Sequence, residues 1–405
     1  MESPSEAAAR ILDCCRRAAP WPDHLLRELV EAAERPEASR AIFRDLVEPL
    51  CDAFEPALCD RYAEVFSDAI AQVQPGWSAR ELRARYARIR RTRPVLGDFA
   101  RVFVLSRVTL GADVAVTSVV LDAVKKRFPR ARIALAGNRK SHELFDADPR
   151  IEFLEAPYSR TGLLRDRLEA GLRLRPLLDG GDALVVDPDS RLSQLGLLPV
   201  ADERRYTFFE SRSAGGGGQA SLGELTRDWV RETFGVEDAR AFIAPASAPV
   251  CDDEGLTAVS FGAGENPAKR IAGDFERELL AYLIERGEAP LLDEGAGGEE
   301  AERARALAAA FAGKVRTWSG AFAPFAASIR RARQYVGYDS AGQHVAAACG
   351  TPLLTVFAGF VSERMFQRWS PSGPSAIEVV KAVGGPVMPE AAAAFERLRS
   401  ARVRP

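Results

Sequence analysis

The sequence lacks paired cysteines, an excess of charge of either sign, and long apolar runs. None of its cysteines has the C-x-x-C spacing that a zinc site favours, and we interpret them as reduced, buried residues: Cys14, Cys15, Cys51, Cys59, Cys251 and Cys349. Lys and Arg number 55 against 57 Asp and Glu, a net charge of −2 that gives no field for a polyanion and makes nucleic acid an unexpected partner. No stretch approaches the roughly 20 apolar residues of a spanning helix, and no signal peptide opens the chain, so the sequence predicts a cytoplasmic location.

What is present is the composition of a folded chain with several cores. The 405 residues exceed one ordinary domain, and 47% hydrophobic with 28% charged residues is typical of globular proteins. Residues 1–95 show apolar positions at three- and four-residue spacing, as in Leu25 and Leu29 or Tyr62 and Phe66, and predict a helical N-terminal domain. Its last segment, 78–93, is rich in arginine. This segment is either a solvated helix face or a contact with an anionic membrane surface.

The rest of the chain alternates short apolar runs with helical segments, a pattern that predicts parallel sheets covered on both faces and the α/β class. Residues 98–248 contain the runs VFVLS, ARIALAG, IEFLEAP and DALVVDP, and residues 255–385 contain LTAVSFG, APLLD, QYVGYD and TPLLTVFAG. The segment APASAPVCDDEG between them is a predicted linker, and the glycine run 215–218 is a predicted loop of the first sheet domain. A final helix over 386–405 is expected to cross back to that domain.

Ligands of such sheets bind beyond the carboxyl ends of the strands, where helix N-termini offer free N–H groups. One loop there is GYDSAGQH, in which Asp339 and Ser340 can cap the next helix and Gly342 allows close approach of backbone to a diphosphate. His344 follows in the first turn of that helix. From the residues alone, a capped helix with a buried histidine is the alternative.

The stretch GYDSAGQHVAAACGTPLLTVFAG resembles the signature of glycosyltransferase family nine, the heptosyltransferase family. The resemblance extends over about residues 98–390 and departs from the family pattern at Ala341, where the family has glycine. It implies the GT-B fold, with two Rossmann-like domains facing a cleft, the first on the acceptor side and the second binding a nucleotide sugar. It assigns Asp339, Ser340, Gly342 and His344 to the donor site.

The loop Gly262 to Arg270 is similar to the segment in which the family's lysine holds the donor phosphate. The resemblance therefore implies donor-binding roles for Gly264, Lys269 and Arg270. In the following LLDEGAGGEEAERARAL, it implies a contact of Glu299 or Glu300 with the donor ribose, although an acidic residue at a helix start also stabilises the helix.

The loop LSRVTLGADV is similar to the family's first strand-to-helix unit, whose aspartate is the proposed general base. Asp113 is thus the predicted catalytic residue, and a helix-capping role is its alternative. Asp187 and Asp189 have the D-x-D spacing of a metal site, but the family works without metal, so we expect no metal and no cofactor.

The resemblance implies transfer of a heptose or similar sugar from a nucleotide-diphosphate donor to a glycan or glycolipid acceptor, by an enzyme in the cytoplasm or peripheral on the inner face of the membrane. Two alternatives stay open. One is a GT-B enzyme that epimerises a nucleotide sugar, and the other is a catalytically silent binding or scaffold protein.

Overall fold

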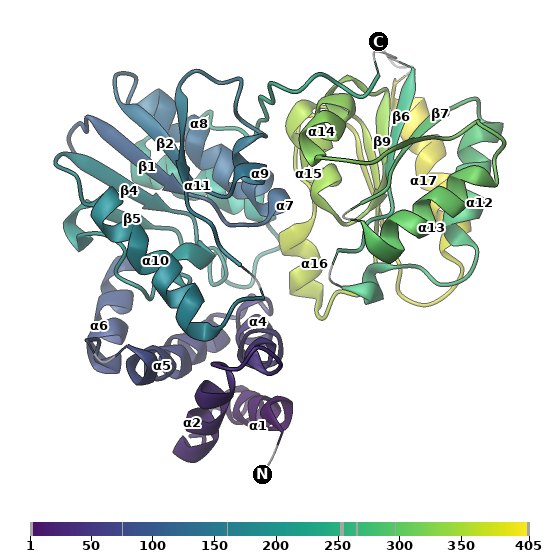
Figure 1. The fold of residues 1–405 in the computed structure, drawn as a ribbon. Helices are drawn as coiled ribbons and strands as arrows, with labels where there is room; N and C mark the ends of the chain where they lie inside the picture. The colour runs from purple at the N-terminus through teal and green to yellow at the C-terminus, as the bar shows by residue number, and fades with distance from the viewer. Residues whose placement is uncertain are drawn as a thin grey trace.

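A computed structural model of the chain describes residues 3–74, 76–159, 161–251, 255–264, 266–295 and 297–402. Two parallel β-sheets covered by helices form two lobes that stand side by side, and helices from the N-terminal region lie under the first lobe (Figure 1). The predicted fold class is confirmed. Some residues of the predicted loops and linker lie outside the described part of the chain: Pro75, Asp252, Asp253, Glu254, Glu265 and Ala296.

The N-terminal region is helical, as its periodicity predicts. Its helices are α1 (Pro4–Arg16), α2 (Asp23–Ala32), the continuous stretch of α3 (Ser39–Ala41), η1 (Ile42–Val47) and α4 (Glu48–Cys51), then α5 (Pro56–Val73) and α6 (Ala79–Ile89). Ser3 and Ser78 accept hydrogen bonds from the free N–H groups of α1 and α6, which fixes where these helices begin.

The first sheet has the strand order β3-β2-β1-β4-β5, all parallel. Its elements are β1 (Arg101–Leu105), α7 (Leu110–Ala112), η2 (Asp113–Thr117), α8 (Ser118–Arg127), β2 (Arg132–Gly137), α9 (Arg139–His142), β3 (Ile151–Glu155), α10 (Leu164–Leu178), β4 (Ala183–Asp187), η3 (Arg191–Ser193), η4 (Glu203–Arg205), β5 (Tyr206–Phe208) and α11 (Leu222–Phe234). Side chains alternate along β1, so Val102 and Val104 pack against α8 and α11 while Phe103 and Leu105 face the opposite side.

The N-terminal helices cover that opposite side of the first sheet. Leu46 and Phe66 belong to the same hydrophobic core as Phe103, Leu105 and Val185. Polar contacts add to this packing, because the Tyr62 hydroxyl donates to the Gln194 carbonyl at 2.7 Å and Arg85 donates to the Gly196 carbonyl at 2.7 Å. The helical region and the first lobe therefore share one core.

The arginines of α6 are largely occupied by the chain itself. Besides Arg85, Arg88 pairs with Glu203 at 2.8 Å, and Arg90, the residue directly after α6, pairs with Glu210 at 2.8 Å. These contacts direct α6 to the first lobe, which weakens the membrane-contact interpretation of segment 78–93. None of the described helices is both long enough and apolar enough to cross a membrane.

A chain that begins at residue 96 should fail to fold stably. It would expose Phe103, Leu105 and the other apolar residues on the face of the first sheet that the N-terminal helices cover. We therefore expect insoluble or aggregating protein. If the N-terminal region were an independently folding domain, its removal would leave the rest of the chain folded. Soluble yield and size-exclusion chromatography of the truncated chain measure this. A monomeric fragment with a cooperative thermal transition would contradict the shared core.

The second sheet has the order β11-β10-β9-β6-β7-β8 and is also parallel. Its elements are β6 (Leu256–Ser260), η5 (Pro267–Lys269), α12 (Phe275–Glu285), β7 (Ala289–Asp293), α13 (Gly298–Ala309), β8 (Arg316–Trp318), α14 (Phe322–Arg331), β9 (Gln334–Tyr338), α15 (Ala341–Cys349), β10 (Leu353–Phe357), α16 (Glu363–Trp369), β11 (Ile377–Lys381) and α17 (Val387–Arg402). Helices α14 and α15 cover the face turned to the first lobe, and α12 and α17 cover the other.

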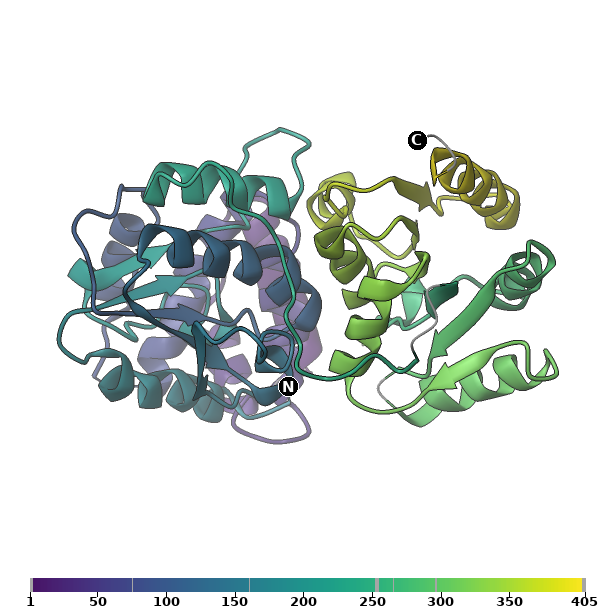
Figure 2. The same ribbon diagram turned by 90° about the horizontal axis from the view of Figure 1, so that it is seen from above.

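The expected crossing of the last helix to the first lobe is wrong. Helix α17 buries Ala391, Ala394, Phe395 and Leu398 in the core of the second lobe, against α12 and strands β10 and β11. Figure 2 shows it on the side of the second lobe away from the first. The apolar face of α17 is buried within the second lobe, so α17 leaves no apolar surface that would have to pack against the first lobe.

Candidate functional site at the interface of the lobes

The N-terminus of α15 carries the residues of the GYDSAGQH segment. Asp339 follows β9 directly and is buried, and its two carboxylate oxygens accept from Lys269 Nζ at 2.7 Å and from Gln343 Nε2 at 2.6 Å. Lys269 also donates to the Asp339 carbonyl at 3.2 Å. The structure thus brings together Lys269 and Asp339, which lie 70 positions apart in the sequence.

The predicted capping by Ser340 is wrong, and the predicted donor roles of Ser340 and Gly342 stay predictions. Ser340 stands at the N-cap position, yet its side chain makes no capping hydrogen bond and its hydroxyl instead lies 3.0 Å from the Tyr335 hydroxyl. A Cβ atom at position 342 would lie 2.5 Å from Tyr335 Cε2. The Tyr335 ring is therefore a sufficient reason for glycine at 342, without any ligand.

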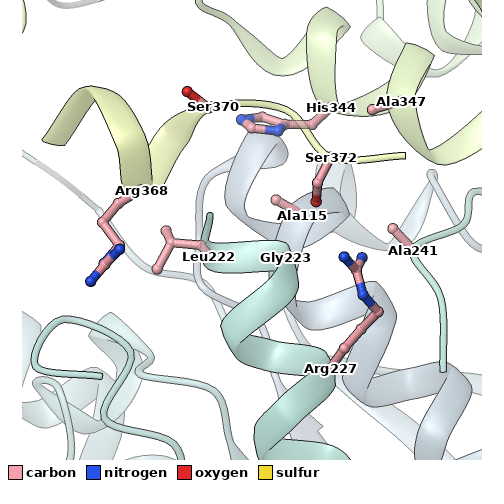
Figure 3. A pocket seen from close by; sticks show the side chains of 10 residues that line it. All are labelled: Ala115, Leu222, Gly223, Arg227, Ala241, His344, Ala347, Arg368, Ser370 and Ser372. Atoms are coloured by element: carbon pink, nitrogen blue, oxygen red, sulfur yellow. The ribbon is translucent and has the colours of Figure 1, made fainter. Parts of the chain in front are cut away.

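His344 lies at the contact between the lobes, where the remaining gap has a volume of only about 10 Å³ (Figure 3). Its ring is 7% exposed and packs against Trp369, with 5.9 Å between the ring centroids. Burial lowers the pKa of His344 to about 4, although the nearby Asp339 carboxylate opposes this shift. The imidazole is neutral at pH 7.

Replacement of His344 by glutamine should reduce the loss of folding stability that occurs as the pH falls from 7.5 to 5. In the unfolded chain this histidine binds a proton below its ordinary pKa of about 6.5, whereas in the folded chain it stays neutral until the pH falls to about 4. Between about pH 6.5 and pH 4, protonation therefore favours the unfolded chain, and above pH 6.5 it has no effect on stability. We expect the wild type to lose about 2 kcal/mol relative to His344→Gln between pH 7.5 and pH 5. Urea unfolding of both proteins at the two pH values measures it, and a difference that does not change with pH would contradict burial of a neutral ring.

The neighbouring basic residues Lys269 and Arg270 lie in two different environments. Lys269 ends the short helix η5 and reaches Asp339, whereas Arg270 pairs with Glu276 at 3.3 Å. Glu276 is buried and also contacts Arg303 at 3.2 Å, so Arg270 belongs to an ion cluster of the second lobe. Gly264 has a φ of +58°, a left-handed conformation that glycine adopts without strain.

Of the two glutamates at the start of α13, Glu300 turns toward the donor loops. Its Oε1 accepts from the Ala263 N–H at 2.9 Å, and a Cβ on Gly295 would lie only 2.4 Å from its Oε2. Glu299 is exposed. Of the two predicted alternatives, Glu300 is the one that contacts the 262–264 loop, and the ribose role of either stays a prediction.

Asp113 is enclosed within the first lobe. Its carboxylate accepts hydrogen bonds from the Ser106 hydroxyl at 2.7 Å, the Arg107 N–H at 2.7 Å and the Thr117 hydroxyl at 2.8 Å, and the side chain is fully buried. Burial raises the pKa of Asp113, while its hydrogen bonds partly oppose the shift. In this closed arrangement the carboxylate holds the loop after β1, and its role as a general base stays a prediction.

Asparagine at position 113 separates the two roles. The amide NH₂ would face a hydrogen-bond donor, so if Asp113 organises the loop we expect Asp113→Asn to lower the free energy of unfolding by about 1–3 kcal/mol. A base alone predicts unchanged stability and a turnover lower by about 10²- to 10⁴-fold. Urea unfolding and turnover measured together decide between the two, with the exposed Asp228→Asn as a control.

Asp187 and Asp189 serve separate buried networks. Asp187 accepts from the Tyr206 hydroxyl and from the Ser190 N–H, and burial raises the pKa of its carboxyl to about 6. Asp189 pairs with Arg212 at 2.8 Å, and the charges of Arg212 and Arg107 hold the pKa of Asp189 below its usual value despite its burial. Within the described part of the chain, no three His, Cys, Asp or Glu side chains gather as a metal site would require.

Sequence reasoning missed two residues, Arg368, which joins the lobes, and Gln343, which acts within the second lobe. Arg368 of α16 is 1% exposed and donates to the carbonyl oxygens of Gly218 at 3.0 Å and Ala220 at 2.5 Å, so the glycine run of the first lobe closes around an arginine of the second. Gln343 joins Asp339 to the Thr355 hydroxyl, which donates to its Oε1 at 2.8 Å. The spacing of four residues between Asp339 and Gln343 was a detectable signal, but nothing local reveals the partners of Arg368.

Two Rossmann-like lobes that meet over the strand ends are the GT-B class of glycosyltransferase fold. Solved structures of that fold resemble the chain: a glycosyl transferase family 9 protein from Veillonella parvula at a TM-score of 0.50 and 16% identity, covering 76% of this chain and 90% of that one; E. coli heptosyltransferase WaaC with ADP at 0.54 and 18%, covering 74% and 99%; and WaaC with ADP-2-deoxy-2-fluoro heptose at 0.53 and 18%, covering 75% and 100%.

A family model matches a segment of the chain that lies mostly in the second lobe. Residues 233–383 match the family model of glycosyltransferase family 9 (heptosyltransferase). The predicted resemblance is confirmed over this segment, and with the GT-B fold it makes the chain a heptosyltransferase-like glycosyltransferase. No curated protein sequence matches the chain.

Proposed function

We propose that the chain transfers a sugar from a nucleotide-diphosphate donor, bound by the second lobe, to a glycan or glycolipid acceptor on the first lobe. The observation that carries this proposal is the meeting of Lys269 and Asp339 at the N-terminus of α15. Free N–H groups and the helix dipole there favour an anion. WaaC, which has the same fold, is solved with ADP and with an ADP-linked fluoro heptose, so an ADP-heptose-type sugar is the first donor to test.

Lys269 has the chemistry to neutralise the leaving diphosphate. Its ammonium carries three N–H groups, and its contacts with Asp339 use two of them, one at the carboxylate and one at the carbonyl. The Asp339 carboxylate therefore positions the ammonium beside the helix N-terminus with one N–H available for a phosphate oxygen. A fixed cation stabilises charge that develops as the bond from the anomeric carbon to the diphosphate breaks.

Other predicted residues have less direct roles in the proposed donor site. His344, neutral and buried beside Asp339, can donate one hydrogen bond but adds no positive charge. Glu300, held at the 262–264 loop, replaces Glu299 as the proposed ribose contact. Gly264 and Arg270 shape that loop. We propose metal-independent transfer, with Lys269 and the α15 N-terminus in the role a metal would take.

Lys269→Ala should weaken binding of an ADP-sugar by at least about tenfold, because a charge-assisted hydrogen bond to phosphate is lost. Isothermal titration of ADP and of ADP-heptose against wild type, Lys269→Ala and the control Lys314→Ala, an exposed lysine beyond α13, measures this. Equal affinity in all three would remove Lys269 from the donor site. Sugar transfer assayed with and without EDTA tests metal independence, and release of an epimer or of no product would favour the two alternative functions.

A further inference from the structure

A second cavity between the lobes lies at the other end of α15 from the donor motif. Its volume is about 570 Å³, within the range of small-molecule sites. Both lobes line it: α11 and the segment after it from the first lobe, and α14, the last residues of α15 and the loop 372–374 from the second. The proposed donor residues Lys269 and Asp339 are not among its lining residues.

Three arginines line this cavity. Arg227 comes from α11, Arg240 from the segment that follows it, and Arg330 from the last turn of α14. No carboxylate lines the cavity, and among the described residues none of the three arginine side chains is paired with a carboxylate at contact distance. The nearest charge effect is on Asp238, whose pKa is lowered mainly by Lys126 and also by Arg240. By contrast, the neighbouring Arg231 on α11 pairs with Asp228 at 2.8 Å.

The surroundings of Arg227 direct its charge into the interface. Arg227 is half-buried, and Figure 3 shows its side chain rising from α11 toward Ser372 and Ala241. Gly223, one turn earlier on α11, leaves the room this arrangement needs, because a Cβ there would lie 2.7 Å from Ser372 Oγ. The cavity also contains the Phe242 ring, an apolar wall beside the three cations.

We propose that this cavity binds a small molecule that carries phosphate groups, at a site separate from the donor site. The three arginines give the cavity lining a positive charge with no carboxylate in it, and a bound anion would lower the repulsion among these charges. Guanidinium forks match the oxygens of phosphate in pairs, the Ser372 hydroxyl supplies a further donor, and Phe242 suits the carbon skeleton of the ligand. Because both lobes contribute residues to the cavity, a bound ligand also stabilises the arrangement of the two lobes seen in this structure.

Inorganic pyrophosphate is the probe, titrated calorimetrically into the full chain. Since pyrophosphate also fits the proposed donor site, the Lys269→Ala variant isolates the second site. We expect Lys269→Ala to retain one binding event for pyrophosphate. In the triple variant Lys269→Ala, Arg227→Gln, Arg330→Gln we expect the pyrophosphate affinity to fall by about tenfold or more for each arginine removed. Lys269→Ala with Arg231→Gln is the matched control, one turn along α11 and outside the cavity, and should bind as Lys269→Ala does.

Retention of pyrophosphate affinity after loss of both cavity arginines would overturn the proposal, as would the absence of any binding event in Lys269→Ala. If the multiple variant fails to fold, Arg330→Gln alone keeps the test, because Arg330 is exposed on the last turn of α14. Flotation with phosphatidylcholine vesicles, with and without phosphatidic acid, identifies the source of the phosphate. Arginine-dependent binding of the acidic vesicles would assign it to a lipid headgroup, and binding of pyrophosphate alone would assign it to a free ligand.

Discussion

The contact between α7 and the N-terminus of α15 fixes the relation of the two lobes. A Cβ at Gly111 would lie 3.2 Å from the His344 ring and 3.4 Å from the Ala341 backbone, so the first lobe approaches the donor motif through a residue without a side chain. Arg368, enclosed by carbonyl oxygens of residues 214–220, holds the same arrangement from the second lobe. Strand ends of one lobe thus come to face the helix N-terminus of the other, and both proposed ligand sites depend on that placement.

The parts of this arrangement that could be predicted from the sequence are local. Buried parallel strands such as β1, β6 and β10 are short apolar runs, and a glycine or an aspartate follows them where a helix N-terminus offers N–H groups. Lys269 and Asp339 follow strands β6 and β9, which pair directly, so the topology brings their loops together. The meeting of Lys269 and Asp339 was therefore predictable, because it depends on strand order and not on distant side-chain partners.

The parts that could not be predicted depend on long-range partners. Strands β5 and β8 have three residues each, too few for a periodicity, and pairing with a neighbour defines them. The apolar stripe of α17 fits either lobe in sequence terms, and only packing against α12 decides. The hydrogen bonds of the Asp113 carboxylate with Ser106 and Thr117 could not be read from the sequence either, because nothing local to Asp113 names these partners. Arg107 and Arg212 are ordinary arginines in the sequence and become a buried cluster only when Asp189 lies between them.

The helical N-terminal region reaches the strand ends of the first lobe through this same cluster. Arg212, which neutralises Asp189 at the end of β4, also lies 3.5 Å from Asp52, just beyond α4. Two residues later, Phe54 packs edge-on against Trp369 of the second lobe, with 6.2 Å between ring centroids, and Trp369 in turn packs against His344. One short turn of the helical region therefore touches the strand ends of the first lobe and the aromatic wall beside the donor motif. A shift of that turn would alter both lobes together, which makes the helical region part of the interface and not an appendage to it.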